Sequence, residues 1–126
     1  MKYRVIMSRV TTMNEELKSI FGDKIAVDGA NVPTAHLRYR GKESTYVVWM
    51  ITAETPVLCG DDIPLYSIVS VDVDVFSKGN YNKVITEIKR IMNDNGWVWT
   101  EDSAEMFEED TEQYHKTISF EKERNL

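Results

Sequence analysis

Long apolar runs are lacking from this chain of 126 residues. A membrane-spanning helix needs about 20 consecutive apolar residues, and no stretch approaches that length, so we expect no membrane contact. Residues 1–9 carry some positive charge but no apolar segment of the length that a signal peptide requires. The single cysteine, Cys59, excludes an internal disulfide framework and fits a reducing cytoplasm.

Positive charge is also scarce. The chain has 15 Lys and Arg against 21 Asp and Glu, which gives a net charge of −6. A generally acidic chain repels the phosphate backbone, so we expect no sequence-specific binding to nucleic acid. A Gly-rich phosphate loop is missing as well, since Gly79 stands alone between a predicted strand and a predicted helix, where turn geometry explains it.

What is present is the composition and length of one globular domain, predicted over residues 1–126. An N-terminal helix is predicted at about residues 4–21, where apolar residues recur every three or four positions; an alternative start is Thr12, with Glu15 completing a capping box. A second helix is predicted at about residues 80–95. Asn80 is its expected N-cap, and Gly96 its expected left-handed residue after the C-terminus.

Alternation of apolar and polar residues predicts the strands. The clearest runs from Tyr66 to Phe76, with four valines on one face and Ser70, Asp72 and Asp74 on the other. Further strands are predicted at residues 36–40, 45–54, 97–100 and 114–123. Residues 23–35 are predicted as a loop with a short extended piece at 25–27, and residues 55–65, with two prolines and a glycine, as a long loop.

These elements predict an α+β fold. Its sheet is expected to be mainly antiparallel with about four to five strands, made of residues 36–76 and the C-terminal strands at 97–123. Two helices are expected to pack on one face of this sheet. The strand at 45–54 is apolar on both faces, which indicates that a helix or a neighbouring subunit covers its second face.

One set of polar residues superficially matches a metal-dependent nuclease: Asp72, Asp74, Glu87 and Lys89. Such a site needs these side chains to converge on one divalent cation. Glu87 and Lys89 are two positions apart on a predicted helix, so they point about 200° away from each other. We interpret the two aspartates as residues on the solvent-facing side of a sheet. A nuclease that uses Asp72, Asp74 and Glu87 is kept as an alternative function.

The other polar candidates have simpler interpretations. The acidic stretch 101–112 lacks the spacing of a calcium loop and is predicted as a surface loop or a patch for a basic partner. His36 and His115 have no third metal ligand at a meaningful spacing, and Cys59 has no activating base. We therefore predict no catalytic, cofactor-binding or metal-binding residues, no cofactor, and no enzymatic activity.

Large aromatic residues are numerous for a chain of this size. They fit either a single well-filled core or burial between subunits, where aromatic residues dominate interface energetics. The rings concerned are Trp49, Phe76, Tyr81, Trp97, Trp99, Phe107 and Tyr114.

Four segments occur in an order that resembles a known family. They are Phe76-Ser77-Lys78-Gly79-Asn80-Tyr81, Gly96-Trp97-Val98-Trp99, Glu105-Met106-Phe107-Glu108-Glu109-Asp110-Thr111 and Tyr114-His115-Lys116-Thr117-Ile118-Ser119-Phe120. Over roughly residues 44–121, their order and spacing resemble the small tail terminator, or tail completion, proteins of siphophages that infect Gram-positive bacteria. Residues 1–43 carry no matching motif.

The resemblance implies a structural role in the virion, made in the cytoplasm of the bacterial host. Such proteins are compact α+β subunits that form a ring, usually of six, at the head-proximal end of the tail tube. The implied partners are other copies of this chain, the tail tube protein and the head–tail connector or neck protein. The resemblance implies that the ring stops tube polymerisation and joins tail to head.

Alternatives remain open beside this interpretation. A head-side neck or head-closure component of the same virion is also small and ring-forming. An adaptor from a prophage remnant, and the nuclease described above, are the others. Residues 55–65 and 101–112 are the expected contact surfaces, because they are long and irregular and flank the sheet ends. We also hypothesise that an acidic ring lining lets DNA pass without sticking.

Overall fold

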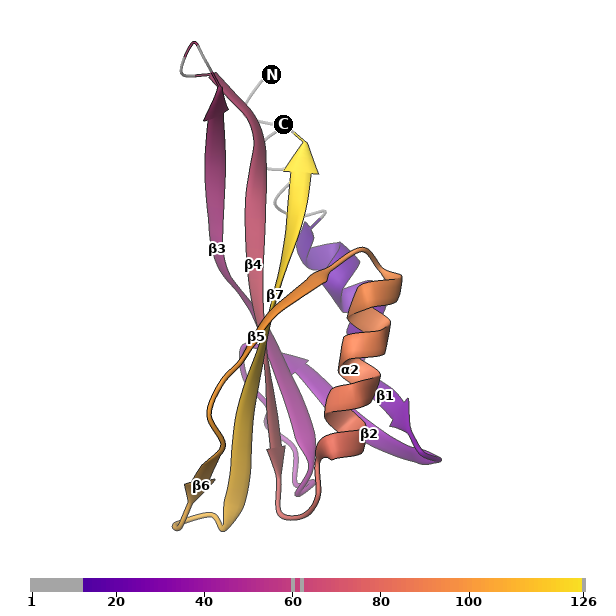
Figure 1. Ribbon diagram of the computed structural model, residues 1–126. Helices are drawn as coiled ribbons and strands as arrows, with labels where there is room; N and C mark the ends of the chain where they lie inside the picture. Colours follow the sequence, from indigo (N-terminus) through magenta and orange to yellow (C-terminus); the bar gives the residue numbers. More distant parts are fainter. Residues whose placement is uncertain (1–12, 60, 62, 126) are drawn as a thin grey trace.

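One long antiparallel hairpin organises the molecule. The computed structural model describes residues 13–59, 61 and 63–125. β3 (Tyr46–Cys59) and β4 (Ile63–Ser77) are 14 and 15 residues long and pair along their length. β7 (Gln113–Asn125) pairs antiparallel with β4 from Tyr66 to Ser77, so β4 lies at the centre of the sheet (Figure 1).

Within the described residues, four shorter strands complete a seven-stranded sheet in the order β1-β2-β3-β4-β7-β5, with β6 also paired to β7. They are β1 (Lys24–Val27), β2 (Ala30–His36), β5 (Val98–Asp102) and β6 (Met106–Glu108). Every pairing is antiparallel except β2 with β3, which is parallel. The α+β class is therefore confirmed, whereas the sheet is mixed and has more strands than the four to five predicted.

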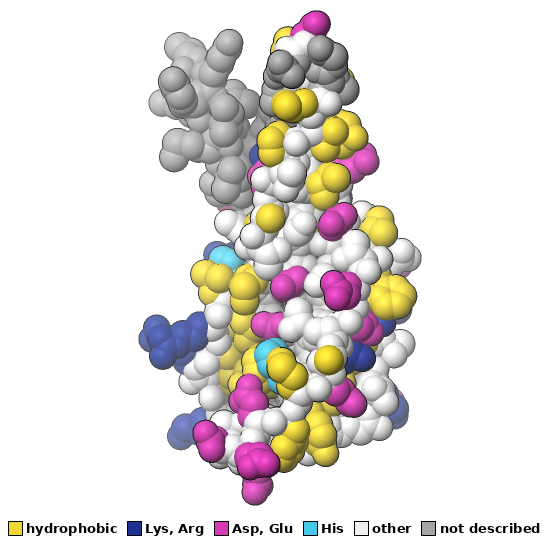
Figure 2. All heavy atoms as spheres, turned by 60° about the vertical axis from the view of Figure 1, so that its left-hand side comes forward, with side chains coloured by type: hydrophobic (Ala, Val, Ile, Leu, Met, Phe, Trp, Pro, Cys, Tyr) yellow, Lys and Arg dark blue, Asp and Glu magenta, His cyan; other side chains and the backbone are white. Residues whose placement is uncertain are grey.

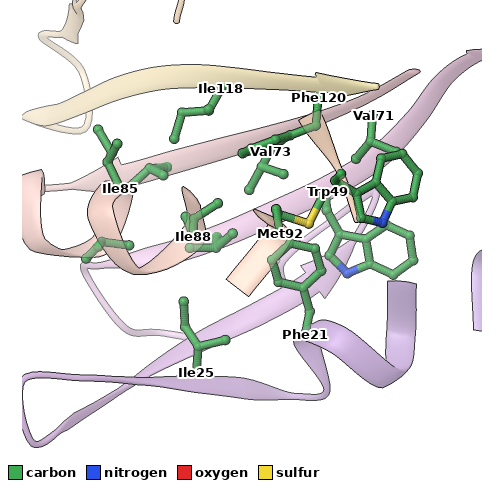
Figure 3. Packing of buried hydrophobic residues seen from close by; sticks show 14 of the residues in the cluster. Phe21, Ile25, Trp49, Val71, Val73, Ile85, Ile88, Met92, Ile118 and Phe120 are labelled. Atoms are coloured by element: carbon green, nitrogen blue, oxygen red, sulfur yellow. The ribbon is translucent and has the colours of Figure 1, made fainter. Parts of the chain in front are cut away.

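The hydrophobic core lies between the sheet and the helices. α2 (Asn82–Asp94) buries Val84, Ile85, Ile88 and Met92, and the N-terminal helix, described over residues 13–21, buries Met13, Leu17 and Phe21. These side chains join the four buried valines of β4 in one cluster. Figure 3 shows part of it, with Val71 and Val73 facing Ile88 and Met92 of α2. Figure 1 shows both helices on the same side of the sheet. Residues 4–12 of the predicted first helix lie outside the described residues.

The predicted helix at 80–95 is confirmed with shorter bounds, but its N-cap is Tyr81 and not Asn80 as predicted. The Asn80 side chain accepts a hydrogen bond from the backbone N–H of Asn82 at 2.9 Å, which satisfies one of the free donors of the first turn. Gly96 follows the helix with a φ of 84°, in the left-handed region that favours glycine.

The long loop predicted at residues 55–65 is wrong. β3 continues to Cys59 and β4 begins at Ile63, so the prolines lie within strands. Pro56 is tolerated because the pairing of β2 with β3 ends at Trp49 and no other described strand pairs with this edge of β3, so no N–H donor is needed there within the described sheet. We call residues 53–58, 61 and 63–68 the arm; in Figure 1 it extends beyond the helices.

The prediction of a loop at residues 23–35 is also wrong, except for its short extended piece at 25–27, which lies in β1. β1 and β2 form a hairpin there, and its turn is Asp28-Gly29, with φ values of 51° and 82°. This is the dipeptide and geometry of a type I′ turn, whose twist matches that of the flanking strands. The strand predicted at 36–40 ends at its first residue, since β2 stops at His36.

The acidic stretch at residues 101–112 is only partly a loop. Its first two residues end β5, and residues 106–108 form β6. The tight turn that follows has Glu112 at a φ of 54° before β7 begins. The prediction of a purely irregular surface loop is therefore wrong, although the side chains from 104 to 112 are exposed.

Candidate functional site

Three of the four resemblance segments meet at one end of the sheet. They are the connection from β4 to α2, strand β6 and the start of β7; we call residues 77–81, 105–108 and 114 the motif corner. Together with Asn82, residues 78–81, Glu105 and Tyr114 line a shallow groove of about 400 Å³. The Ser77 hydroxyl accepts the N–H of Gly79 at 3.1 Å, which fixes the turn.

Tyr81 ties these segments together. Its ring is buried, and its hydroxyl donates a hydrogen bond to the Glu105 carboxylate. Burial, together with this carboxylate, raises the pKa of Tyr81 to about 12. The ring centre lies 6.2 Å from that of Tyr114, which in turn lies 5.0 Å from Phe107. Aromatic contacts at these distances fix the relative positions of strands and turn.

The outer surface of the motif corner is apolar in its middle and mainly acidic around it, although Lys78 adds an exposed cation. Met106, Phe107 and Tyr114 are exposed although they are large and apolar. The acidic side chains around them, all exposed, are Glu105, Glu108, Glu109, Asp110 and Glu112. Figure 2 shows hydrophobic and acidic side chains together at the lower end of the molecule. An apolar centre with a charged rim is typical of a protein-binding surface.

The face of the sheet opposite α2, which we call the open face, is acidic. Along β4 and β7 its charged positions are Asp72, Asp74, Glu121 and Glu123, and the described residues of these two strands place no Lys or Arg there. Asp72 accepts a hydrogen bond from the Ser119 hydroxyl at 2.7 Å. Asp74 accepts one from the Thr117 hydroxyl at 2.5 Å, so cross-strand partners hold both carboxylates in place.

A row of stacked rings crosses the same face. Tyr39 stacks on Tyr46 at 4.3 Å, Tyr46 on Phe76 at 4.8 Å, and Phe76 on His115 at 4.2 Å. Burial and the nearby charge of Glu108 raise the pKa of Tyr46. Sequence reasoning missed this row because it depends on the register of β3, β4 and β7, which no local pattern specifies.

The residues of the nuclease alternative do not come together. Asp72 and Asp74 are on the open face, whereas α2 packs against the opposite face. Glu87 pairs with Arg90 on its own helix. Lys89 lies 3.1 Å from a carboxylate oxygen of Asp102. In the part of the chain that the structure describes, no group of three His, Cys, Asp or Glu residues is placed to hold a metal ion.

Asp102 is nevertheless a strongly engaged carboxylate. Burial alone would raise its pKa, but hydrogen bonds from Lys89 and Trp99 and the charge of Lys116 outweigh burial and hold the pKa below its usual value. The Lys89 ammonium also lies 3.9 Å from the centre of the Trp99 ring. This group joins α2 to β5 and β7.

The two histidines occupy separate packing positions. His36 stacks on Trp49, with the ring centres 4.2 Å apart. The pKa of His36 is lowered, mainly by burial and to a smaller extent by the charge of Lys18. His115 belongs to the ring row and has its Nε2 3.5 Å from an oxygen of Asp74. Cys59 ends β3. Of the predicted aromatic surplus, Trp49 and Trp97 are fully buried, whereas Trp99, Phe107 and Tyr114 are exposed.

Comparison with known proteins does not assign a function to these surfaces. Among the described residues, none of the helices has both the length and the apolar character needed to cross a membrane. No family model and no curated protein matches the chain.

Proposed function

We propose that this chain is a structural protein of a phage virion, a tail terminator that caps the tail tube as a ring, stops tube polymerisation and joins tail to head. One observation carries the proposal: three of the segments that resemble this family pack together in the motif corner, around the buried Tyr81 and the Glu105 carboxylate. Those residues act as turns and anchors, as expected of a protein whose activity is surface complementarity.

The motif corner supplies a contact surface for such a role. Met106, Phe107 and Tyr114 offer apolar area at its centre. The acidic rim favours a partner with basic residues at matching positions and disfavours partners with acidic ones. In a ring of six, the same weak surface is presented six times at fixed spacing, so a hexameric tube end or neck gains avidity that a single subunit lacks.

The open face suits the lining of a DNA channel. Its charged residues along β4 and β7 are all acidic, and an acidic wall repels the phosphate backbone instead of binding it. Cryo-electron microscopy of the tail end tests this part of the proposal. A ring in which Asp72 and Asp74 face away from the channel contradicts it.

The decisive experiment is electron microscopy of a lysate from the phage or prophage that encodes this chain, with a stop codon in its gene. A terminator predicts overlong, headless tail tubes beside DNA-filled heads. Tails of normal length beside leaking heads would instead assign the chain to the neck. Intact infectious particles would overturn both structural functions and favour an enzyme or a non-functional prophage remnant.

A second experiment addresses the motif corner itself. The double variant Glu108→Lys/Glu109→Lys reverses two exposed charges of the rim, so we expect a folded subunit that fails to join tails to heads. The matched control is Glu15→Lys/Asp23→Lys, which makes the same charge change at exposed positions elsewhere. Normal phage yield from the Glu108→Lys/Glu109→Lys variant would remove the motif corner as a contact surface.

A further inference from the structure

The end of the arm combines exposed apolar and acidic side chains. Leu58, Ile63 and Leu65 are 55%, 60% and 56% exposed, and Asp61 is exposed between them. We call these four residues the arm tip. The register sets Leu58 opposite Pro64, so Leu58 lies on the other face of the hairpin from Ile63 and Leu65. Exposed apolar side chains on both faces of a projecting end mark a surface for another macromolecule.

A second exposed surface has the opposite charge. Residues 37–42, which we call the basic loop, contain the exposed cations Arg38, Arg40 and Lys42. No ion pair among the described residues engages any of the three. Leu37, at 61% exposure, adds an apolar side chain beside them.

The backbone of the basic loop is held in place. The Tyr39 ring stacks on Tyr46, and its hydroxyl accepts the N–H of Glu43 at 3.1 Å. Leu37 has a φ of 68°, while the Arg38 N–H donates to the His36 carbonyl at 2.7 Å. This pattern indicates a γ-turn with positive φ, which is rare and strained for a bulky residue. Strain that persists around an exposed side chain points to a functional role.

We infer that the arm tip of one copy of this chain docks on the basic loop of a second copy. The two surfaces are complementary. The arm tip carries Asp61, with Ile63 and Leu65 on one face of the hairpin and Leu58 on the other, whereas the basic loop carries Leu37 with three cations. They cannot meet within one subunit. The Leu37 N–H donates to the Trp49 carbonyl, and Leu58 lies nine positions beyond Trp49 along β3, about 30 Å at the rise of a strand.

A contact between two different surfaces of the same chain is heterologous, so it generates either a closed ring or an open chain of subunits. Each subunit uses its arm tip toward one neighbour and its basic loop toward the other. That these contacts close into a ring rests on the proposed function. The contact between two copies does not, and it can be measured on the isolated protein. Because the contact includes exposed opposite charges, it weakens as salt is added.

The test is sedimentation velocity at low salt over a series of protein concentrations. The series reaches about 1 mM, so that a contact with a dissociation constant of that order is still detected. One variant is Asp61→Lys, and the other is Arg38→Glu/Arg40→Glu. The matched controls, Glu15→Lys and Lys24→Glu/Lys78→Glu, make the same charge changes at exposed positions outside the arm and the basic loop. Circular dichroism and thermal unfolding establish that every variant is folded.

We expect the wild-type chain and both controls to associate beyond the dimer, and each variant alone to associate at least about tenfold more weakly. An equimolar mixture of the two variants restores association. The reversed arm tip of the Asp61→Lys variant then meets the reversed basic loop of the Arg38→Glu/Arg40→Glu variant at one interface. At the next interface, the two unchanged surfaces meet. A mixture that stays as weak as its components overturns the inference. So does a wild-type chain that stays monomeric throughout, or variants that associate like the controls.

These outcomes separate the contact from the proposed function. Restored association in the mixture, together with intact particles from the stop-codon phage, would keep the contact and reject the terminator. Overlong tails together with an unaffected Asp61→Lys variant would keep the terminator and reject this interface.

Discussion

Replacing Leu37 with glycine tests whether the start of the basic loop stores backbone strain. Leu58 is the matched control, because it is also a leucine, is similarly exposed (55% against 61%) and lies in a strand without a positive φ. At both positions the change to glycine removes a partly buried side chain and adds about 0.5–1 kcal/mol of unfolded-chain entropy. Only at Leu37, with its φ of 68°, does it also remove a steric penalty of about 1–2 kcal/mol.

The difference between the two variants therefore measures the strain, because the common costs cancel. We expect Leu37→Gly to change the free energy of unfolding by less than about 1 kcal/mol, and Leu58→Gly to cost about 1–2 kcal/mol more than that. Urea unfolding followed by tryptophan fluorescence, at a concentration low enough to keep subunits apart, gives both values. Equal losses at the two positions would refute the strain. If the inferred contact is correct, Leu37→Gly also weakens association without weakening the fold.

Three further predictions concern the core and two titrating groups. Ile88→Ala, in the core between α2 and the sheet, should cost about 2–5 kcal/mol in urea unfolding, whereas Val98→Ala, at an exposed position, should stay within about 0.5 kcal/mol. Folding raises the pKa of Tyr81 to about 12, so above pH 10 the hydroxyl proton is lost more readily from the unfolded chain than from the folded one. The free energy of unfolding should therefore fall between pH 10 and 12, by about 1–2 kcal/mol after solvent screening. The variant Tyr81→Phe should remove that fall. Because folding lowers the pKa of Asp102, its contribution is present above pH 3.8 and lost as the pH falls through the folded-state value; Asp102→Asn should flatten this part of an acid-unfolding curve.

Local sequence patterns predicted the strands and helices whose buried residues recur at the regular spacing of a strand or a helix. The valines of β4 alternate with polar residues, and both predictions from that alternation hold: a strand, and Asp72 and Asp74 on the face away from α2. The α2 stripe was equally clear, because a helix makes its hydrogen bonds within itself and so depends little on distant residues.

The errors arose where structure depends on distant partners. Pro56 is typical of a loop, but no described strand pairs with this edge of β3, so within the described sheet its missing N–H costs nothing. The Asp28-Gly29 turn was a hairpin signal in the sequence, and was overlooked because the strands beside it are short and weakly patterned.

The motif corner was only partly predictable. The segments that form it were recognised along the sequence, but their meeting depends on the register of β4 with β7, which places Ser77 opposite Tyr114. Such pairs lie far apart in the chain and carry no local signature. The same holds for the row of rings that crosses the open face.

The position of β7 also has a consequence for the order of folding. Among the described strands β7 is the last to be synthesised, yet it lies inside the sheet, between β4 and β5. Its partner residues in β4 precede it by 37 to 59 positions, from Ser77 with Tyr114 to Tyr66 with Asn125. Long-range pairing of this kind slows folding. The β3–β4 hairpin can form early, but the open face and the motif corner exist only after β7 has left the ribosome.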